Sequence, residues 1–539
     1  MDNRDYDDDL DENTELLPFP VEHKAKEKKT LFFIFLSALI ISIGTIGLVS
    51  IWVKLTNGPE KRNVILMISD GFGPASETFA RDYYQFVNGL SYDNVIPLDR
   101  IQVGSSRTRS ADSLVTDSAA GATAFSCVKK TYNGAIGVDT DQTPCGTILE
   151  AAKAIGMKTG LVVTSRITHA TPASFSAHVI SREMEEIIAT QQLGDYPLGR
   201  QVDLMIGGGR CFFLPNSTTG SCRSDDRDLI AEAKNSGFTY FSSRNEFDKI
   251  DPKSQSIPLI GLLTLDHMSY EIDRNPTDEP SLKEMSEKAI RILEKQTADS
   301  DKGFFLMIEG SRIDMAAHSN DPGAHVHDIL AYNEAIDFVT KYVDDHPGTV
   351  VISVSDHETG GLTLALQTDY YEYPEYLWYP DVISRIKNSS YALSVELTKY
   401  WSNDRTEYIK DNILRNSLGI SDFSDDEVNF LVANHTQQEY EIYMANLTSW
   451  RALVGWTTHG HTGVDVNLYA HGKNTNALRG NHENTYIGQF ITKYLNLDPD
   501  SITLRLNSNN TFHKSTSNIT NYNVDHLAHY HAGHIPRRT

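Results

Sequence analysis

NVILMIS, residues 63–69, is an apolar run that is followed directly by an aspartate. Four more runs have the same character: GLVVTS (160–165), VDLMIG (202–207), FFLMIEG (304–310) and TVVISVS (349–355). None of them alternates polar and apolar residues, which is the pattern of strands buried on both faces of a parallel sheet. We therefore expect these runs to form the centre of one large sheet.

Segments with helical character lie between the runs, such as PCGTILEAAKAIG (144–156) and SLKEMSEKAIRILEKQT (281–297). This alternation predicts the α/β class, with a doubly wound, mostly parallel sheet flanked by helices. We assign this domain to residues 55–500. Residues 362–455 lack clear alternation and contain the aromatic stretch TDYYEYPEYLWYPD, so we predict an accessory insertion there.

The chain end differs in composition from the domain. Residues 505–539 are rich in Asn, Ser, Thr and His, and we predict a disordered tail. The histidines of this tail could alternatively bind a metal.

Residues 31–53, LFFIFLSALIISIGTIGLVSIWV, carry no charge and are long enough to cross a bilayer with some tilt. The alternative is a cleaved signal peptide, but its apolar part is only about 7–15 residues long. Several lysines precede the segment and only Lys54 follows it closely, which places residues 1–30 in the cytosol. We therefore predict a transmembrane signal anchor in a single-pass, type II membrane protein whose larger part is lumenal.

Two features agree with a lumenal body. N-x-[ST] sequons, the acceptors of N-glycosylation, follow the predicted anchor; they begin at Asn216, Asn388, Asn434, Asn446, Asn509 and Asn518.

The cysteines are Cys127, Cys145, Cys211 and Cys222, and oxidising compartments favour disulfides. Of the three possible pairings, we expect the local ones, 127 with 145 and 211 with 222; a zinc–thiolate site is the alternative, although no C-x-x-C spacing supports it.

The N-terminal tail contains a candidate sorting signal. In the stretch ENTELLP, Glu12 is followed by Leu16 and Leu17. This resembles the acidic dileucine signal that clathrin-type adaptor complexes bind on cargo for lysosomes or vacuoles; the alternative is a short apolar patch in a disordered tail. We predict the vacuole membrane as the location.

The net charge of −24 argues against nucleic acid as a partner, because it repels phosphate backbones at long range.

Acidic residues follow several of the predicted strands. Asp70 follows the first run, Glu309 lies within the run at 304–310, and Asp356 and His357 follow the run at 349–355. Because parallel strands end at the same edge of a sheet, these carboxylates should lie together. Unpaired, they would raise one another's pKa, and metal ions remove that problem.

Two further stretches offer chemistry. Asp314 and His318 share a helix face at i,i+4 spacing, and the stretch GHTG supplies His461; together these residue types suit zinc. In TDSAAGATAF (116–125) the pair Asp117–Ser118 precedes very small residues. It is either a helix N-cap or a nucleophile held at a helix N-terminus where an anion can approach. These residues alone leave both interpretations open.

Taken together, ISDGFG, VTDSAAGATA, THATP, SRE, IEGSRIDMAAH, SDHETGGL and HGHTG resemble the alkaline phosphatases, in the same order, between about residues 60 and 500. With the anchor and the dileucine, the resemblance is to the fungal vacuolar members. It implies a phosphate monoester hydrolase of broad substrate range that acts through a phosphoserine intermediate. It also implies two Zn²⁺ and one Mg²⁺ per subunit, and a homodimer to which the insertion contributes.

The resemblance also implies a role for each matching residue. Ser118 matches the nucleophile, and Arg182 matches the residue that holds the phosphoryl oxygens. Asp356 and His357 match ligands of the zinc that activates the serine, and Asp70 links this zinc to magnesium. Matches at Asp314, His318 and His461 imply the second zinc site. Matches at Thr171 and Glu309 imply the remaining magnesium ligands.

Two positions differ between branches of the family. Bacterial members commonly have Asp where this chain has His169 and Lys where it has Met315, whereas animal members commonly have His at both. Met315 brings neither a ligand nor a charge, so magnesium affinity and product release are the properties that this change affects. A sulfatase is excluded because C-x-P-x-R is absent; a catalytically inactive membrane glycoprotein is the alternative from another class.

Overall fold

The computed structural model describes residues 32, 34–39 and 61–508. The chain divides into two units, residues 1–60 and residues 61–539. In the first, the described residues are helical. Across the described part of the chain, no helix has both the length and the hydropathy needed to cross a membrane. The predicted anchor falls mostly outside the described residues, and the predicted dileucine signal falls outside them entirely.

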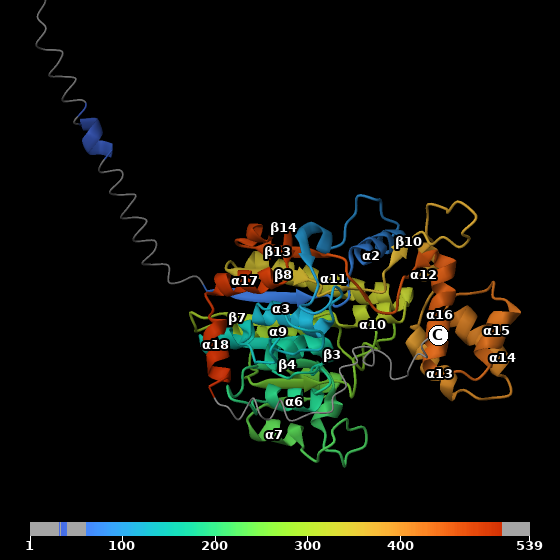
Figure 1. Ribbon diagram of the computed structural model, residues 1–539, viewed down its shortest axis with the longest axis horizontal. Helices are drawn as coiled ribbons and strands as arrows, with labels where there is room; N and C mark the ends of the chain where they lie inside the picture. The colour runs from blue at the N-terminus through green and yellow to red at the C-terminus, as the bar shows by residue number, and fades with distance from the viewer. Residues whose placement is uncertain (1–31, 33, 40–60, 509–539) are drawn as a thin grey trace, which may run out of the picture. The chain divides into compact units, whose positions relative to one another are not determined.

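A ten-stranded sheet forms the centre of the second unit, in the order β14-β2-β13-β8-β1-β7-β3-β4-β6-β5 (Figure 1). The five predicted runs are confirmed as β1 (Asn63–Ile68), β3 (Lys158–Arg166), β4 (Leu204–Gly208), β7 (Phe304–Glu309) and β8 (Thr349–Val354). The remaining strands are β2 (Gln102–Arg107), β5 (Thr239–Phe241), β6 (Leu259–Leu262), β13 (Val466–Gly472) and β14 (Gly480–Glu483). In this sheet only β13 runs antiparallel to its neighbours, so the mostly parallel α/β prediction is correct.

The central strands are buried on both faces, which explains their continuous apolar sequence. Alternate residues of β1 enter two different cores: Ile65 and Met67 lie in one, and Val64, Leu66 and Ile68 lie in the other. All five are fully buried. The sheet is therefore the partition between two apolar layers of helices.

The first core contains α2 (Pro74–Val87), α9 (Leu282–Gln296) and α11 (Pro322–Asp345). The second contains α3 (Ser118–Cys127), α4 (Ile148–Ala154), α5 (Ala170–Ser176), α17 (Thr485–Leu495) and α18 (Pro499–Leu506). Both helices predicted in the sequence are present, and both begin at a capping box. Ser281 and Glu284 start α9, and Thr147 and Glu150 start α4, because each pair satisfies two free N–H groups reciprocally.

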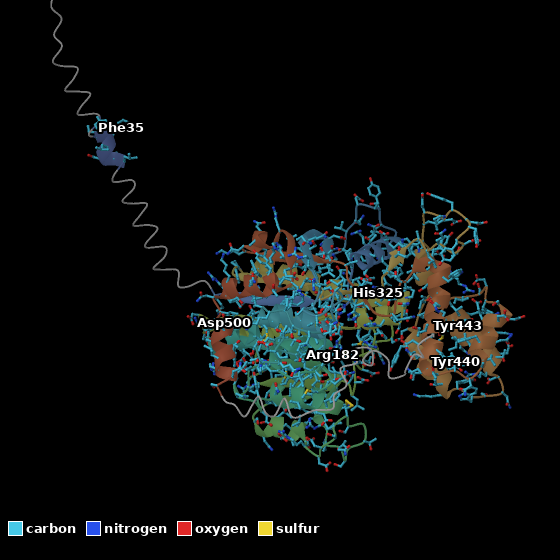
Figure 2. The ribbon with its side chains drawn as sticks, in the orientation of Figure 1. Phe35, Arg182, His325, Tyr440, Tyr443 and Asp500 are labelled. Atoms are coloured by element: carbon cyan, nitrogen blue, oxygen red, sulfur yellow. A yellow bond between two sulfur atoms is a disulfide. The ribbon has the colours of Figure 1, made fainter. Side chains whose placement is uncertain are left out.

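The predicted insertion is a group of helices, drawn in orange beside the sheet (Figure 1). It consists of α12 (Pro380–Ile383), α13 (Ser390–Lys399), α14 (Arg405–Tyr408), a π-helical turn (Ile409–Ser417), α15 (Asp425–Val432) and α16 (Gln437–Ala452). The chain leaves through β10 (Thr363–Leu364) and returns through β11 (Val454–Gly455), which pair antiparallel. Figure 2 shows Tyr440 and Tyr443 of α16 within this group, away from Arg182. Shorter helices elsewhere include α6 (Glu185–Gln192), α7 (Leu229–Asn235) and α8 (Arg244–Lys249). Five two-residue or single-turn pieces lie at β9 (Glu358–Thr359), β12 (His461–Thr462), Leu98–Ile101, Arg210–Phe213 and Thr475–Leu478.

Both local disulfides are present. The Cα atoms of Cys127 and Cys145 are 5.8 Å apart, and those of Cys211 and Cys222 are 4.9 Å apart, so the expected pairing is confirmed. A zinc–thiolate site is thereby ruled out for these residues.

The described sequons and the chain end can be placed as well. Asn216, Asn434 and Asn446 are exposed and Asn388 is partly buried, whereas the last two sequons lie outside the described residues. The predicted start of the C-terminal tail is wrong at residues 505 and 506. These residues belong to α18, because Leu506 is fully buried in the second core.

Candidate active site

The carboxyl ends of three adjacent strands bring acidic residues together. Glu309 is the last residue of β7, and Asp70 and Asp356 each follow two residues after the end of β1 and β8. The register pairs Ile68 with Glu309 on one side and with Val354 on the other. The side chains of Asp70, Glu309 and Asp356 are fully buried. The predicted cluster at this edge of the sheet is therefore present.

A first group of metal-ligand type combines one carboxylate with two histidines. Asp314 and His318 lie on the short helix α10 (Arg312–His318), with His318 Nε2 3.4 Å from Asp314 Oδ2. The pairing of β12 with β9 delivers His461, whose Nε2 is 3.7 Å from Asp314 Oδ1 and 3.1 Å from His318 Nε2. Three possible ligand atoms from two distant parts of the chain thus lie within 4.8 Å of one another.

The orientation of these histidines is fixed from behind. Nδ1 of His318 is 2.5 Å from the carbonyl oxygen of His459, and Nδ1 of His461 is 2.8 Å from that of Thr116. A carbonyl oxygen can only accept, so each Nδ1 donates its proton and each Nε2 keeps a lone pair directed into the site. This is the arrangement typical of metal-bound histidine. The neighbouring His459 is not one of the three ligand residues; its Nδ1 lies 2.8 Å from the His318 carbonyl oxygen.

A second group contains Asp70, Asp356 and His357. His357 Nε2 lies 3.5 Å from Asp70 Oδ1 and 3.3 Å from Asp356 Oδ2. Behind the ring, the Thr359 hydroxyl donates to Asp314 over 2.6 Å and lies 3.2 Å from His357 Nδ1. Since that hydroxyl proton is already used, its oxygen accepts from Nδ1, and again Nε2 offers a lone pair to the site.

A third group lies on the other side of Asp70. It comprises Asp70, Glu309 and His169, whose ligand atoms lie within 4.8 Å of one another. Burial raises the pKa of Glu309, and the nearby Ser311 and Thr171 side chains partly oppose that rise. The Thr171 hydroxyl is buried on α5 and makes no hydrogen bond within the described residues. The family resemblance implied Asp70, Thr171 and Glu309 as ligands of one ion but did not include His169. The available signal was the position of His169 just after β3, at the N-terminus of α5.

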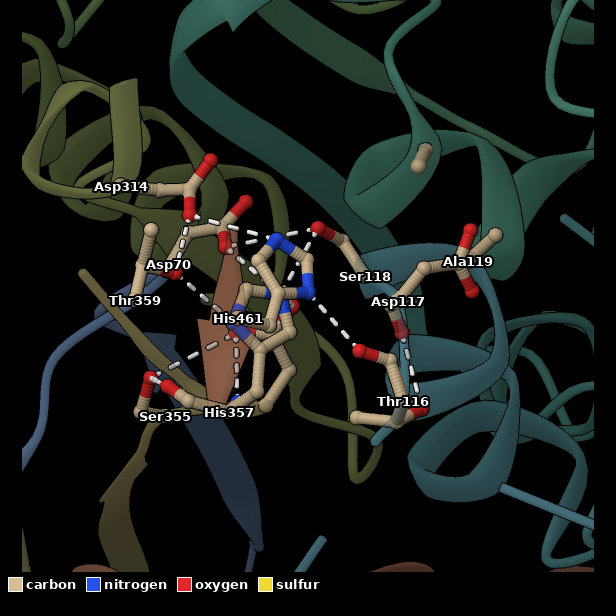
Figure 3. A network of polar contacts seen from close by, with 12 residues as sticks. Asp70, Thr116, Asp117, Ser118, Ala119, Asp314, Ser355, His357, Thr359 and His461 are labelled. Atoms are coloured by element: carbon tan, nitrogen blue, oxygen red, sulfur yellow. Dashed lines mark hydrogen bonds and ion pairs between the residues drawn. The ribbon is translucent and has the colours of Figure 1, made fainter. Parts of the chain in front are cut away.

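Ser118 is the first residue of α3, and its hydroxyl points into the second group. Ser118 Oγ is 3.1 Å from His357 Nε2 and 3.5 Å from Asp70 Oδ1 (Figure 3). The N-cap is Asp117, whose side chain accepts from the Ala120 N–H at 2.9 Å. The helix N-cap expected at the Asp117–Ser118 pair is therefore present, but Asp117 and not Ser118 is the capping side chain.

The small residues after Ser118 have a packing reason. A Cβ atom added at Gly121 would lie 2.9 Å from Asp356 Cβ, which is closer than two such carbons approach. Ala119 and Ala120 are also buried. The first turn of α3 consequently lies directly against the residues that follow β8, and Ser118 is held next to Asp356 and His357.

Arg182 is the cation of the site. It is buried, its Nη1 donates to Asp117 Oδ2 at 3.1 Å, and its Nη2 is 3.1 Å from His169 Nε2. Burial would raise the pKa of Asp117, but Arg182 and the backbone donors Ala120 and Gly134 outweigh it and lower that pKa. Asp117 is thus an ionised anchor that orients the guanidinium.

The carboxylates of the sheet edge carry strongly perturbed pKa values. Burial, followed by the charges of neighbouring carboxylates, raises the pKa of Asp70 well above its usual range. Burial likewise raises the pKa of Glu309 to about 8 and that of Asp356 to about 7, while burial lowers the pKa of His357 to about 4. Without added positive charge, these acids cannot all be ionised near neutral pH.

The donor set fits metal ions. One oxygen on each of Asp70, Glu309, Asp314 and Asp356 is buried and makes no hydrogen bond within the described residues. Buried carboxylate oxygens with no donor, beside imidazole nitrogens directed into the same space, are the ligand types that zinc takes, and oxygen-rich sets also suit magnesium. The second and third groups share Asp70. The His461 ring of the first group stacks on the His357 ring of the second, with 3.5 Å between the ring centroids, so the three groups form one continuous centre.

Met315 lies at the edge of this centre and is partly buried. The Arg312 Nη1 is 2.8 Å from Met315 Sδ, and the guanidinium stacks on the Tyr270 ring with 3.7 Å to its centroid. Met315 itself brings no charge to the site, as its sequence position indicated.

Comparison with known proteins agrees with this geometry. The family model described as alkaline phosphatase matches residues 61–497. The chain is 44% identical over 531 residues to the repressible alkaline phosphatase of Saccharomyces cerevisiae, covering 91% of this chain and 93% of that protein. It is 49% identical over 446 residues to an alkaline phosphatase of Schizosaccharomyces pombe, covering 82% and 83%. The crystal structure of Thermus thermophilus alkaline phosphatase is similar with a TM-score of 0.69 and 30% identity, covering 83% of this chain and 95% of that one. From its sequence, its fold and its metal-ligand groups, the chain belongs to the alkaline phosphatase family.

Proposed function

We propose that this metal-dependent phosphate monoester hydrolase acts through a phosphoserine intermediate formed on Ser118. One observation supports this above the others: Ser118 Oγ lies 3.1 Å from His357 Nε2 and 3.5 Å from Asp70 Oδ1, at the N-terminus of α3. A hydroxyl in this place can share a cation with those ligands, and a serine is a weak nucleophile until such a partner lowers its pKa.

The proposed reaction has two displacements at phosphorus. In the first, the Ser118 oxygen forms a bond to phosphorus while the bond from phosphorus to the alcohol oxygen breaks, and the alcohol leaves with a proton. In the second, water attacks the phosphoserine, inorganic phosphate leaves, and the Ser118 hydroxyl is restored. Both steps transfer the same phosphoryl group in line.

The residues around Ser118 hold that group. Arg182 presents a planar fork of N–H donors that fits two phosphoryl oxygens, and its ion pair with Asp117 fixes the direction of the fork. The N–H groups of the first turn of α3 and the helix dipole favour an anion at this end. The small side chains of that turn leave the backbone accessible to it.

The metal complement is proposed as two Zn²⁺ and one Mg²⁺ per subunit. One zinc would be held by Asp314, His318 and His461, and the other by Asp70, Asp356 and His357. Asp70, Thr171 and Glu309 would hold magnesium, with His169 adjacent. When bound, these ions would supply positive charge that lowers hydroxyl pKa values and stabilises the attacking and leaving oxygens.

Substrate range and location complete the proposal. Recognition centred on the phosphoryl group favours a broad range of small-molecule phosphate monoesters. The sequence of the N-terminal segment supports a type II membrane protein of the vacuole, with the active site in the lumen and the tail bound by a clathrin-type adaptor complex. We also propose a homodimer, with the insertion at 362–455 contributing to the contact, and no nucleic-acid partner.

A combined metal and activity assay tests the proposed function. The full-length chain, solubilised in detergent, should contain close to two zinc and one magnesium ions and should hydrolyse nitrophenyl phosphate. Chelation should abolish hydrolysis, and zinc with magnesium should restore it together. Hydrolysis that persists after the metal content has fallen to zero would contradict the proposal.

A further inference from the structure

Three exposed apolar side chains adjoin at the edge of the active site. Leu114 is 71% exposed, Val115 37% and Val464 47%. A Cβ atom added at Gly463 would lie 3.2 Å from the Leu114 carbonyl oxygen and 3.7 Å from Val115 Cγ2, so the loop before Ser118 and the loop after His461 are in contact. We call Leu114, Val115 and Val464 the apolar rim.

The backbone of the apolar rim is fixed although its side chains face solvent. The Val115 carbonyl accepts from Asn133 Nδ2 at 3.0 Å, and the Val464 carbonyl accepts from the Thr108 hydroxyl at 3.2 Å. Single exposed apolar residues are common on protein surfaces. Here two loops that touch, and that the hydrogen bond from His461 to the Thr116 carbonyl oxygen joins, present three of them. Apolar residues grouped in this way mark binding surfaces.

The apolar rim is attached to one particular side of the site. Thr116, which follows Val115, accepts from His461 Nδ1 at 2.8 Å through its carbonyl, and Figure 3 shows Thr116 next to His461. Ser118 Oγ instead contacts the group that contains His357 and Asp70. In an in-line displacement the leaving oxygen departs on the side opposite the nucleophile. Because Ser118 lies at the group of Asp70 and His357, we assign the leaving side to the group of Asp314, His318 and His461.

We propose that the apolar rim binds the organic part of the substrate, and that the enzyme therefore prefers phosphate monoesters of apolar alcohols. This inference rests on the proposed function and refines its broad substrate range. The phosphoryl oxygens need N–H donors and cations, which Leu114, Val115 and Val464 do not offer. What these side chains offer is apolar area next to the departing oxygen, and an alkyl or aryl group gains free energy by covering it.

A chain-length series tests the inference. Straight-chain alkyl phosphates from ethyl to pentyl share nearly the same leaving-group acidity, so their kcat/KM values differ through binding of the chain. With the full-length enzyme in detergent at one fixed concentration, we expect kcat/KM to rise about two- to fourfold per added methylene over the first carbons, as expected for partial to full burial of each CH₂.

The Leu114→Asn, Val464→Thr double variant should remove most of this rise. Inhibition by inorganic phosphate, which has no organic part, reports whether the phosphoryl site is intact. Leu504→Asn is the matched control, because Leu504 is 74% exposed on α18; α18 carries Asp500, which lies well apart from Arg182 in Figure 2. If the double variant fails to fold, Leu114→Asn alone should reduce by half the slope of log kcat/KM against the number of methylenes.

The outcomes separate the inference from the function on which it rests. A flat chain-length series in the unaltered enzyme, or a rise that persists in the double variant, overturns the inference and leaves the proposed function standing. Failure to hydrolyse any alkyl phosphate or nitrophenyl phosphate with zinc and magnesium present overturns both.

Discussion

At the scale of single residues, Asp117 and Ser118 have separate tasks at the start of α3. Asp117 caps the helix and anchors Arg182, which leaves the Ser118 hydroxyl to face His357. The sequence could not separate these tasks, since either side chain can cap a helix. Only the three-dimensional position of His357, which is distant along the chain, shows where the Ser118 hydroxyl points.

Arg182 gives the first prediction at this scale. Arg182→Ala should weaken inhibition by inorganic phosphate and lower kcat/KM by roughly 10- to 150-fold, which corresponds to losing about 1.5–3 kcal/mol of hydrogen bonding to a charged group. Arg182→Lys should have a kcat/KM between those of Arg182→Ala and the unaltered enzyme, because lysine keeps the charge but loses the planar fork. Steady-state kinetics with phosphate as the inhibitor provide the measurement.

The control for Arg182 is Arg291→Ala, an exposed arginine on α9 that pairs with Glu287. This variant should change neither kcat/KM nor the inhibition constant of inorganic phosphate. If Arg182→Ala bound phosphate as tightly as the unaltered enzyme while retaining its metal content, the guanidinium would have no part in holding the phosphoryl group.

At the scale of secondary-structure elements, a fully buried ion pair connects α4 to the segment after α5. His178 Nε2 lies 2.9 Å from Glu150 Oε1, and His178 Nδ1 lies 2.7 Å from the Gly137 carbonyl oxygen. Both nitrogens face acceptors, so the ring is suited to carry two protons. Burial opposes the charge, but the Glu150 carboxylate outweighs burial and raises the pKa of His178. Burial similarly opposes ionisation of Glu150, and His178 outweighs it and lowers that pKa.

The direction of the His178 shift fixes a pH dependence. A histidine whose pKa is raised by folding contributes stability that is complete below its unfolded pKa of about 6.5 and is lost as pH rises through the folded value. His178→Gln should therefore lower the thermal midpoint by several degrees near pH 6, and by less at higher pH. Thermal unfolding across pH 6–9 with excess zinc provides the measurement.

The matched control is the pair of His346 and Glu294, which has the same 2.9 Å separation but is about two-fifths exposed. Exposed pairs contribute only about 0–1 kcal/mol, so His346→Gln should have a small effect at every pH. Equal effects of the two substitutions would show that burial does not strengthen the His178 pair.

Elements of this fold differ in how well the sequence predicts them. The five buried strands were recognisable because burial on both faces leaves a continuous apolar signature. The strand β2, QVGSSR, and the strand β14, GNHE, lie toward an edge and are largely polar, so they carry no such signature. The individual helices of the insertion were not predicted, because the stretch at 368–381 that precedes them is crowded with aromatic residues and the region shows no strand–helix alternation.

The residues of the metal centre also differ in how well the sequence predicts them. Acids that directly follow strands were predictable, since topology alone gathers strand ends. His461 reaches the centre through a two-residue pairing of β12 with β9, and His169 reaches it from the N-terminus of α5. Neither contact has a local pattern. The sequence offered His461 only as a further histidine, the family resemblance assigned it to a zinc site, and His169 emerged as a possible ligand only from the structure.

At the scale of the whole molecule, the proposed location depends on the N-terminal tail rather than on the catalytic unit. Leu16→Ala with Leu17→Ala should leave hydrolysis unchanged and move the protein away from the vacuole, because the catalytic unit of residues 61–497 does not include the tail. Microscopy of the tagged full-length chain provides the measurement. Leu10→Ala is the control within the same acidic tail, and vacuolar location of the double variant would contradict the sorting signal.

The central claim is that Ser118 carries the phosphoryl group between the two displacements. Ser118→Ala should fold and keep its metals, because Asp117 is the cap and the other ligands remain; the lost hydrogen bond costs only about 0.5–1.5 kcal/mol. The most direct test is to quench the enzyme with acid during turnover of a phosphate monoester labelled in its phosphoryl group, and to map the labelled peptide. We predict one labelled peptide that contains Ser118 and no label in Ser118→Ala. Label on another residue, or equal labelling of Ser118→Ala, would contradict the account.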